Sequence, residues 1–358
     1  MASRLLILLG TRKGAFILEG SPGRDAFLVR GPFCETMPIQ HLAWDPASGS
    51  LLAGAGSPWF GPTVWRSPDL GGTWSQASDG ITYGDDVPAV TRVWTVTPAN
   101  GALYAGVEPA GLFRSVDGGV TWSHVSALRD HPSCAGWQPG NGGLILHTIV
   151  AHPTDPARMW IGISAVGVFE TRDGGSSWTA RNRGVRADHL PDTYPETGVC
   201  VHKFGLHPAN PERLYQQNHS GAYRSDDGGA NWRDINAGLP SHFGFPLVVH
   251  PHDPETIWTV PLNGDDIGRY MPEAAMAVWR SRDGGASWQR QADGLPQQHA
   301  YLGVLREAMA VDRLDPVGVY IGTSTGQLFG SRDEGGTWSL LADFLPPISS
   351  VEAVLVDA

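Results

Sequence analysis

Cysteine, basic residues and long apolar runs are all scarce in this chain, and each shortage excludes a class of protein. The 358 residues include three cysteines, Cys34, Cys134 and Cys200, an odd number without paired metal-ligand spacing, so no disulfide framework is expected. No apolar stretch reaches the length that spans a membrane. Because 25 basic residues stand against 36 acidic ones, a net charge of −11, neither nucleic acid nor an anionic membrane is an expected partner.

The N-terminal residues do not have the pattern of a secretory signal. The apolar run Leu5–Leu9 is short, is followed by no small-residue cleavage site, and fits a β-strand of the repeat described below. The sequence therefore predicts a cytoplasmic protein.

The most abundant feature of the chain is a short repeated motif. The segment Ser67–Trp74 (SPDLGGTW) recurs in five further copies, and the motif aspartates stand at positions 69, 117, 173, 227, 283 and 333. They are 48, 56, 54, 56 and 50 residues apart, and a period near 50 is typical of propeller or solenoid repeats. An aspartate in a tight glycine-rich turn accepts backbone N–H bonds, so we expect these six residues to stabilise turns and not to catalyse.

The motif resembles the Asp box, or bacterial neuraminidase repeat, of a β-propeller family. That family includes sialidases, xyloglucanases, sortilin-type receptors and photosystem assembly factors, and the resemblance covers nearly the whole chain at the level of blades. It implies a propeller architecture, but the members have unrelated functions, so it does not name a reaction.

Hairpins of alternating strands precede the motifs, and a seventh hairpin lies at Leu6–Ile17. The predicted inner strands before the other hairpins are Gln40–Asp45, Arg92–Thr97, His147–His152, His202–His207, Phe245–His250 and Glu307–Asp312. The N-terminal hairpin has no inner strand before it, whereas Glu352–Asp357 at the other end fits the pattern. We therefore predict an all-β, seven-bladed propeller, a single domain over 1–358, closed by the C-terminal strand joining the N-terminal blade.

The first residues of the inner strands should open on one rim of the channel, opposite the Asp motifs. Aligned on the strand ends, this row is Gln40, Arg92, His147, His202, Phe245, Glu307 and Glu352, polar at six of seven positions. Buried polar groups cost free energy unless water, partners or a ligand satisfy them, so this ring is the main candidate site. A shift by one residue would replace Gln40 by His41.

Two chemistries fit the ring, and a water-filled channel mouth is the structural alternative. His147, His202, Glu307 and Glu352 provide imidazoles and carboxylates that could hold one divalent metal ion. Alternatively, Glu307 and Glu352 act as the general acid and the nucleophile or base of a glycosidase. The repeated turns such as His152–Pro156 are expected to stabilise turns and not to bind a ligand.

Loops on the same rim supply further ligand-binding candidates. With Gln40 and Arg92 of the ring they are Arg12, Trp59, Trp137 and Tyr194, whose aromatic members could stack on a sugar. The sequence lacks the Arg-Ile-Pro motif of sialidases, and Arg306 adjoins a ring residue and should face away from the channel, so sialidase activity is not expected. Three functions remain open: a small-molecule enzyme, glycosidase-like or metal-centred; a protein-binding scaffold that uses the loop face; and a carbohydrate-binding module.

Overall fold

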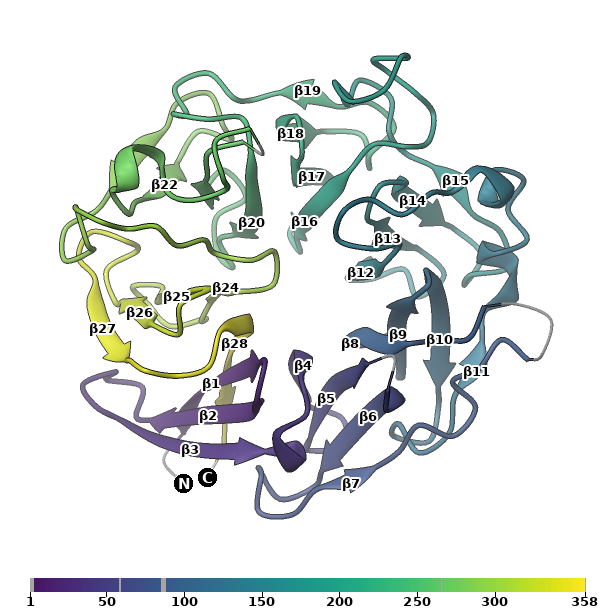
Figure 1. Cartoon of the computed structure of the whole chain (residues 1–358), viewed down its shortest axis with the longest axis horizontal. Coiled ribbons are helices and arrows are strands. Elements are labelled where there is room, and N and C mark those ends of the chain that lie inside the picture. The colour runs from purple at the N-terminus through teal and green to yellow at the C-terminus, as the bar shows by residue number, and fades with distance from the viewer. Residues whose placement is uncertain (1–2, 58, 85–87, 265, 358) are drawn as a thin grey trace.

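The protein is an all-β, seven-bladed propeller, as predicted (Figure 1). The computed structural model describes residues 3–57, 59–84, 88–264 and 266–357. Within them the strands form seven four-stranded sheets around a central channel, and the helices are single turns of three residues: η1 (Cys34–Thr36), η2 (Ser126–Leu128), η3 (Cys134–Gly136) and η4 (Pro272–Ala274). No helix in this described part of the chain is long and apolar enough to cross a membrane.

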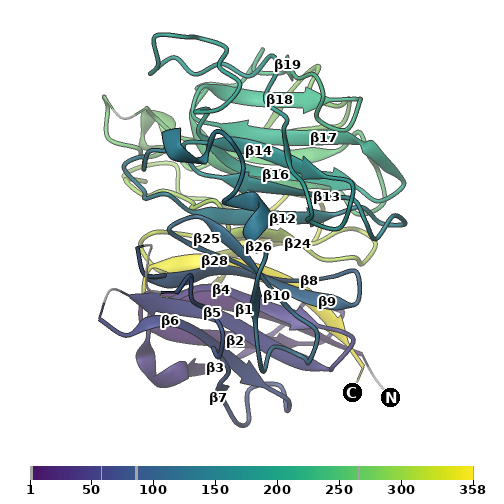
Figure 2. The same cartoon turned by 90° about the vertical axis from the view of Figure 1, so that its right-hand side faces the viewer.

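Each blade is an antiparallel sheet whose first-named strand lies innermost (Figures 1 and 2). Blade one contains β28 (Ile348–Val356), β1 (Arg4–Thr11), β2 (Gly14–Gly20) and β3 (Phe27–Phe33); blade two β4 (Ile39–Asp45), β5 (Ser50–Ser57), β6 (Gly61–Ser67) and β7 (Ser75–Gln76). Blade three contains β8 (Arg92–Ala99), β9 (Ala102–Glu108), β10 (Gly111–Ser115) and β11 (Ser123–His124); blade four β12 (Leu146–Ala151), β13 (Met159–Ile163), β14 (Gly167–Thr171) and β15 (Thr179–Ala180). Blade five contains β16 (Val201–His207), β17 (Asn210–Asn218), β18 (Gly221–Ser225) and β19 (Arg233–Asp234); blade six β20 (Gly244–Val249), β21 (Ile257–Pro261), β22 (Val278–Ser281) and β23 (Gln289–Gln291). Blade seven contains β24 (Met309–Val311), β25 (Val319–Gly322), β26 (Leu328–Ser331) and β27 (Ser339–Ala342).

The C-terminal strand closes the ring. β28 pairs with β1 along its whole length, from Arg4 opposite Val356 to Thr11 opposite Ile348. Successive residues of a strand point to opposite faces, and both faces of β1 are buried. Leu5, Ile7 and Leu9 pack in the core shared with blades six and seven, whereas Leu6 and Leu8 pack with residues of blade two. The apolar run at the N-terminus is therefore a strand buried on both faces.

Strand direction divides the connections between two faces of the disc. Because neighbouring strands are antiparallel, connections between second and third strands and between successive blades lie on one face, which we call the loop face. Connections between first and second and between third and fourth strands lie on the opposite face, which carries the six Asp motifs. The predicted candidate site therefore lies opposite the motifs, on the loop face.

All six motif turns have the same hydrogen bonds. In the first, the Ser67 hydroxyl donates to Asp69 Oδ1 at 2.9 Å and accepts the Gly71 N–H at 2.8 Å, while Thr73 donates its N–H to Asp69 Oδ1 at 2.8 Å. The same three bonds recur in the other turns. Each motif aspartate is thus committed to its own turn, which agrees with a structural role.

The histidine-containing turns after the inner strands are also structural. Nδ1 of His207 accepts the N–H of Ala209 at 3.1 Å, and Nδ1 of His250 accepts that of His252 at 2.9 Å. Asp312 accepts the N–H of Leu314 at 3.0 Å at the corresponding position of blade seven. Histidine and aspartate are therefore interchangeable turn acceptors here, as the sequence analysis expected.

The motif turns predict a specific loss of stability in acid. Hydrogen bonds from the Ser177 hydroxyl and amide lower the pKa of Asp173 to about 2, and the other five motif carboxyls also have a lowered pKa. A carboxyl whose pKa is lower in the folded than in the unfolded chain stabilises the folded state at pH values above its unfolded pKa of ~3.9. This stabilisation is lost as the pH falls toward ~2. We therefore expect the urea concentration at the unfolding midpoint to decrease as the pH is lowered from about 4 to 2. In the Asp173→Asn variant this midpoint should decrease less steeply over the same pH range than in wild type. The exposed Asp130, changed to Asn, is the control; equal slopes for wild type and Asp173→Asn would contradict the assignment.

Candidate functional site

Most inner strands contain a β-bulge close to their first residue, at the loop face. The pairing skips Gln40 in β4, Trp94 in β8, His147 in β12 and His202 in β16, so each is an extra residue at the start of its strand. A bulge re-aims the side chains beside it and is common next to functional sites. Three of these residues belong to the predicted ring.

The predicted ring is displaced by two residues in blade three. β8 extends to Ala99 instead of ending at Thr97, and its bulge places Trp94 at the position that Gln40 and the two histidines occupy. Arg92 is the first residue of β8, at the end of the strand nearest the loop face, and its Nε is 2.8 Å from Glu108 Oε2. The alignment that put Arg92 in the ring is therefore corrected: Trp94 occupies that position, because the inner strand is longer than its pattern indicated.

His147 and His202 each donate a hydrogen bond to the backbone of the next blade. Nε2 of His147 donates to the Val201 carbonyl at 3.1 Å, and its Nδ1 is 2.8 Å from the Thr148 hydroxyl. Nδ1 of His202 donates to the Gly244 carbonyl at 2.6 Å. Burial, and after it the charge of Arg306, hold the pKa of both imidazoles well below the usual range, so both rings are neutral.

The four predicted metal ligands do not form one cluster. Both ring nitrogens of His147 have partners, and the two carboxylates turn to other side chains. Across the described residues, the one group of three or more potential ligands within 4.8 Å of one another is Cys200, His202 and His219. Of the four predicted metal ligands only His202 belongs to it; His219 lies in a turn on the rim where loop candidates were expected, and Cys200 was not expected to bind metal.

Glu307 and Glu352 lie where blades seven and one meet. The carbonyl of Glu307 accepts the Val351 N–H at 2.8 Å, and Glu307 bridges Ser350 in parallel, so Glu307 and Glu352 are diagonal neighbours. Strand spacing and rise put their Cα atoms about 8 Å apart. The side chains nevertheless diverge: the buried Glu307 carboxylate forms an ion pair with Lys203 of blade five, and Glu352 Oε1 is 3.2 Å from His41 Nε2 of blade two.

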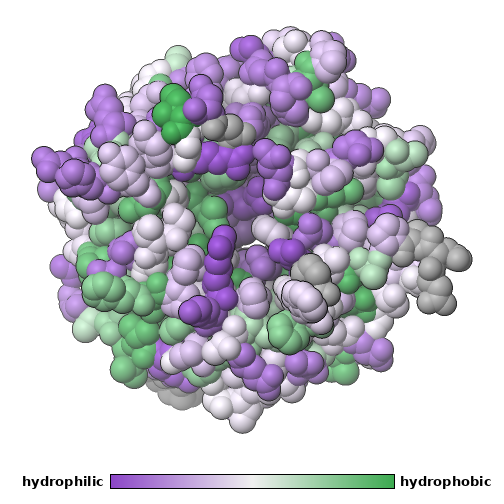
Figure 3. Space-filling model, in the orientation of Figure 1, coloured by the Kyte–Doolittle hydropathy of each residue, from purple (hydrophilic) through white to green (hydrophobic). Residues whose placement is uncertain are grey.

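Arg306 faces the channel, contrary to the prediction that it faces away. Its guanidinium carbon lies 5.7 Å from the ring centre of Trp94 and 5.7 Å from that of Phe245, on the inner strands of blades three and six. Burial lowers the pKa of this guanidinium, although the side chain retains some contact with solvent. The prediction assumed regular strand alternation, but Arg306 precedes β24 and lies in irregular backbone. Hydrophilic side chains surround the central opening (Figure 3).

A cleft of about 630 Å³ opens on the loop face between blades five and six. Its walls come from four connections and consist of Asp188, His189, His219, Ser220, Leu239, Pro240, Ser241, His242, Phe243, Gly264 and Asp266. The rings of His202, His219 and Phe243 pack against one another at its inner end, with centroid distances of 5.1–5.8 Å. Two residues of the cleft wall, His219 and Phe243, are therefore in contact with His202 of the predicted ring.

Exposed aromatic side chains are confined to the loop face in the described structure. They are Trp59 (93% exposed), Phe60 (70%), Tyr194 (59%), Tyr301 (64%) and Phe344 (94%), and all lie in connections of that face. Trp137 is different: it is buried, its ring packs 5.6 Å from that of Phe169, and its Nε1 donates to Ser133. Trp137 is thus a core residue without a free face for a ligand, whereas the exposed Arg12 lies in the β1–β2 turn of the loop face.

Comparison with known proteins finds sequence similarity to xyloglucanases. The sequence is 27% identical over 278 residues to a xyloglucanase of Hypocrea jecorina, which covers 69% of this chain and 29% of that enzyme. It is 26% identical over 283 residues to a xyloglucanase of a Paenibacillus species, covering 72% of this chain and 25% of the enzyme. No family model matches the sequence.

The solved structures agree with the fold. The crystal structure of an ancestral GH74 enzyme superposes on 88% of this chain and 38% of that protein, with a TM-score of 0.55 and 16% sequence identity. The chain therefore has the propeller fold of these proteins, and it spans less than a third of the length of the two xyloglucanases named above.

Proposed function

We propose that the protein is a glycoside-hydrolase-like propeller that takes an oligosaccharide of the xyloglucan class on its loop face. The observation that carries this proposal is the confinement of exposed aromatic side chains to that face, in a chain whose sequence is similar to xyloglucanases over about 70% of its length. An aromatic ring offers a flat apolar surface on which a sugar ring can stack.

A pair of tyrosines beside the cleft supports this proposal. The rings of Tyr270 and Tyr301 are 5.1 Å apart, and Tyr301 is 64% exposed. The carbonyl of Tyr270 accepts the N–H of Asn263, which closes the loop that supplies Gly264 and Asp266 to the cleft. A sugar stacked on these tyrosines would place its neighbouring units at the cleft, where carboxylates and imidazoles provide hydrogen-bond partners.

The channel carboxylates Glu307 and Glu352 are the proposed catalytic groups, although β28 begins at Ile348 and therefore places Glu352 deeper in the channel than the predicted start of its strand. Glu307, which forms an ion pair with Lys203, is the proposed nucleophile or base. Glu352, which is more exposed and lies 3.2 Å from His41 Nε2, is the proposed general acid. Their Cα atoms are about 8 Å apart and their carboxylates diverge, so the pair suits the ~6.5–9.5 Å carboxyl distance of inverting glycosidases better than the ~5–5.5 Å of retaining ones.

Removing single loop-face aromatics should weaken glycan binding without affecting the fold. Trp59→Ala and Tyr301→Ala are each expected to raise the Kd for a xyloglucan oligosaccharide about tenfold, because one stacked ring contributes about 1.4 kcal/mol. Calorimetric titration measures the Kd, and unchanged melting confirms folding. Val116→Ala, an exposed apolar residue on the motif face, is the matched control. Wild-type protein that binds no xyloglucan oligosaccharide, or aromatic variants that bind as wild type does, would refute the proposal and favour a protein-binding scaffold.

A further inference from the structure

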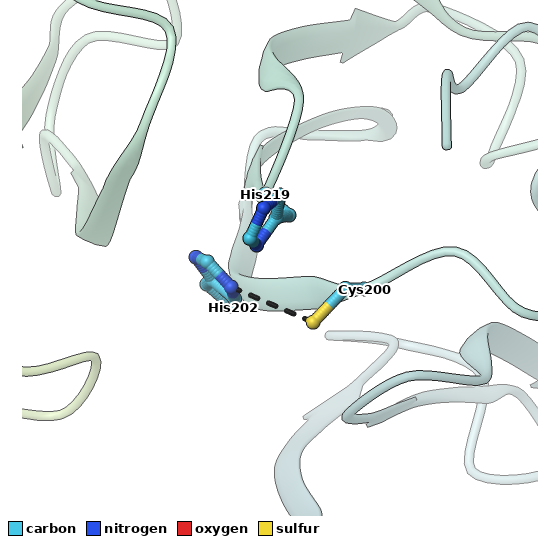
Figure 4. A group of neighbouring side chains, drawn as sticks. All are labelled: Cys200, His202 and His219. Atoms are coloured by element: carbon cyan, nitrogen blue, oxygen red, sulfur yellow. Dashed lines mark hydrogen bonds between the residues drawn. The ribbon is translucent and has the colours of Figure 1, made fainter. Parts of the chain in front are cut away.

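Backbone pairing brings Cys200, His202 and His219 together at the start of blade five. Cys200 and His202 flank the first residue of β16, and alternate residues of a strand share a face. His219 follows β17, and its N–H donates to the Cys200 carbonyl at 2.9 Å, so the turn is fixed to the strand. Figure 4 shows the imidazoles and the thiol side by side. Main-chain hydrogen bonds thus determine this arrangement.

The distances within this group suit a tetrahedral metal ion. The Cys200 Sγ and His202 Nε2 atoms are 3.6 Å apart, and one ligand atom from each residue lies within 4.8 Å of the others. Bond lengths of ~2.3 Å to sulfur and ~2.0–2.1 Å to nitrogen give about 3.5 Å between these two atoms around a tetrahedral ion. The Cys200–His202 pair therefore already has the required spacing, and a small rotation of His219 completes the set.

His202 is oriented as a metal ligand. Its Nδ1–H donates to the Gly244 carbonyl at 2.6 Å, which fixes the tautomer and directs the Nε2 lone pair toward the Cys200 sulfur. A backbone carbonyl that holds the second ring nitrogen is the usual support of a metal-bound histidine. We propose that Cys200, His202 and His219 bind one Zn²⁺ ion whose fourth position opens to the cleft between blades five and six.

The three ligand side chains favour zinc, and the residues around them favour an anionic fourth ligand. One thiolate and two imidazoles are the nitrogen and sulfur donors that zinc prefers, and three protein ligands leave a position for water or another molecule. His219 also lines the cleft, so that position is reached from solvent. Arg306 lies close enough to Cys200 for their charges to interact, and its positive charge favours an anionic fourth ligand such as hydroxide or a carboxylate.

Metal binding to untagged protein tests the site directly. Chelator-treated protein titrated with Zn²⁺ against a chromophoric chelator should take up about one equivalent, and Co²⁺ in its place should give a thiolate-to-metal charge-transfer band. Cys200→Ser should abolish that band, and Cys200→Ser and His219→Ala should each weaken zinc binding more than about 100-fold, since even supporting residues of zinc sites contribute 10–100-fold. Neither readout depends on glycan binding or hydrolysis, so the result is independent of the proposed function.

Matched variants separate this site from adventitious binding. Cys134→Ser removes another partly exposed cysteine, and His242→Ala removes a histidine of the same cleft outside the group; both should bind zinc as wild type does. His202→Asn, changed at a buried position, is interpreted only if its melting temperature matches wild type. If Cys200 and His202 only share a hydrogen bond and bind no metal, the Co²⁺ charge-transfer band should be absent, and wild type and Cys200→Ser should bind zinc with equal affinity. Either result would overturn the proposal.

Discussion

A chain that ends at Pro347 is expected not to fold. It lacks β28, including Ile348, Val351 and Val356, which are at most 5% exposed. Burying each contributes about 1.5–3 kcal/mol, so their loss alone approaches the ~5–15 kcal/mol that stabilises a typical domain. The truncation also uncovers one edge of β1 and one face of its apolar run. Circular dichroism and urea unfolding should show no cooperative transition.

A circular permutant is the matched control for the truncation. Arg4 and Val356 are paired, so residues 346–357 placed before residue 3 through a short turn would form an ordinary inner-strand hairpin. Because every contact of β28 is kept and only the connection changes, the permutant should melt as wild type does. A truncated chain that melts at the wild-type temperature would show that closure by β28 contributes little. A permutant that fails to fold would show that the order of the strands matters beyond their contacts.

The sequence predicted the ring because each blade repeats a local pattern. Alternating hairpins, motif turns at a period near 50 and an unpartnered inner strand at Glu352–Asp357 are visible without tertiary information, and the structure confirms seven blades and their closure. Propeller blades pair strands that are close in the sequence, so local signals determine most of the topology.

The site was less predictable because bulges and cross-channel contacts are not periodic. One extra residue at Trp94 or His202 changes which side chains reach the channel, and the apolar pattern of a strand does not mark a bulge. The Lys203–Glu307 ion pair joins residues 104 positions apart, and Arg306 meets rings from two other blades. The only signal for the Cys200, His202 and His219 group was the Cys-x-His spacing, which is weak without the turn that carries His219.

Replacing Glu307 by glutamine should have the largest effect on activity. If Glu307 acts as nucleophile or base, hydrolysis of xyloglucan oligosaccharides should fall about 10²–10⁴-fold, because glutamine keeps the shape but neither accepts a proton nor attacks the sugar. The Kd for the same oligosaccharide should stay within a few-fold of wild type, since Trp59 and Tyr301 are unchanged. Glu352→Gln should also slow hydrolysis, and most strongly for substrates with poor leaving groups.

The ion pair with Lys203 makes a structural effect of Glu307→Gln the main competing explanation. Loss of the carboxylate leaves the Lys203 ammonium partly buried without its counter-charge, so melting must be compared with wild type. Rescue of a truncated side chain separates the two roles: azide or formate should restore turnover in Glu307→Ala, where the shorter side chain leaves room for the anion, if the missing group is a nucleophile or base, but would not repair a displaced lysine. Glu196→Gln, a change in a loop before β16 on the same face, should hydrolyse at the wild-type rate. A folded Glu307→Gln protein with wild-type turnover would remove hydrolysis at this carboxylate from the proposal.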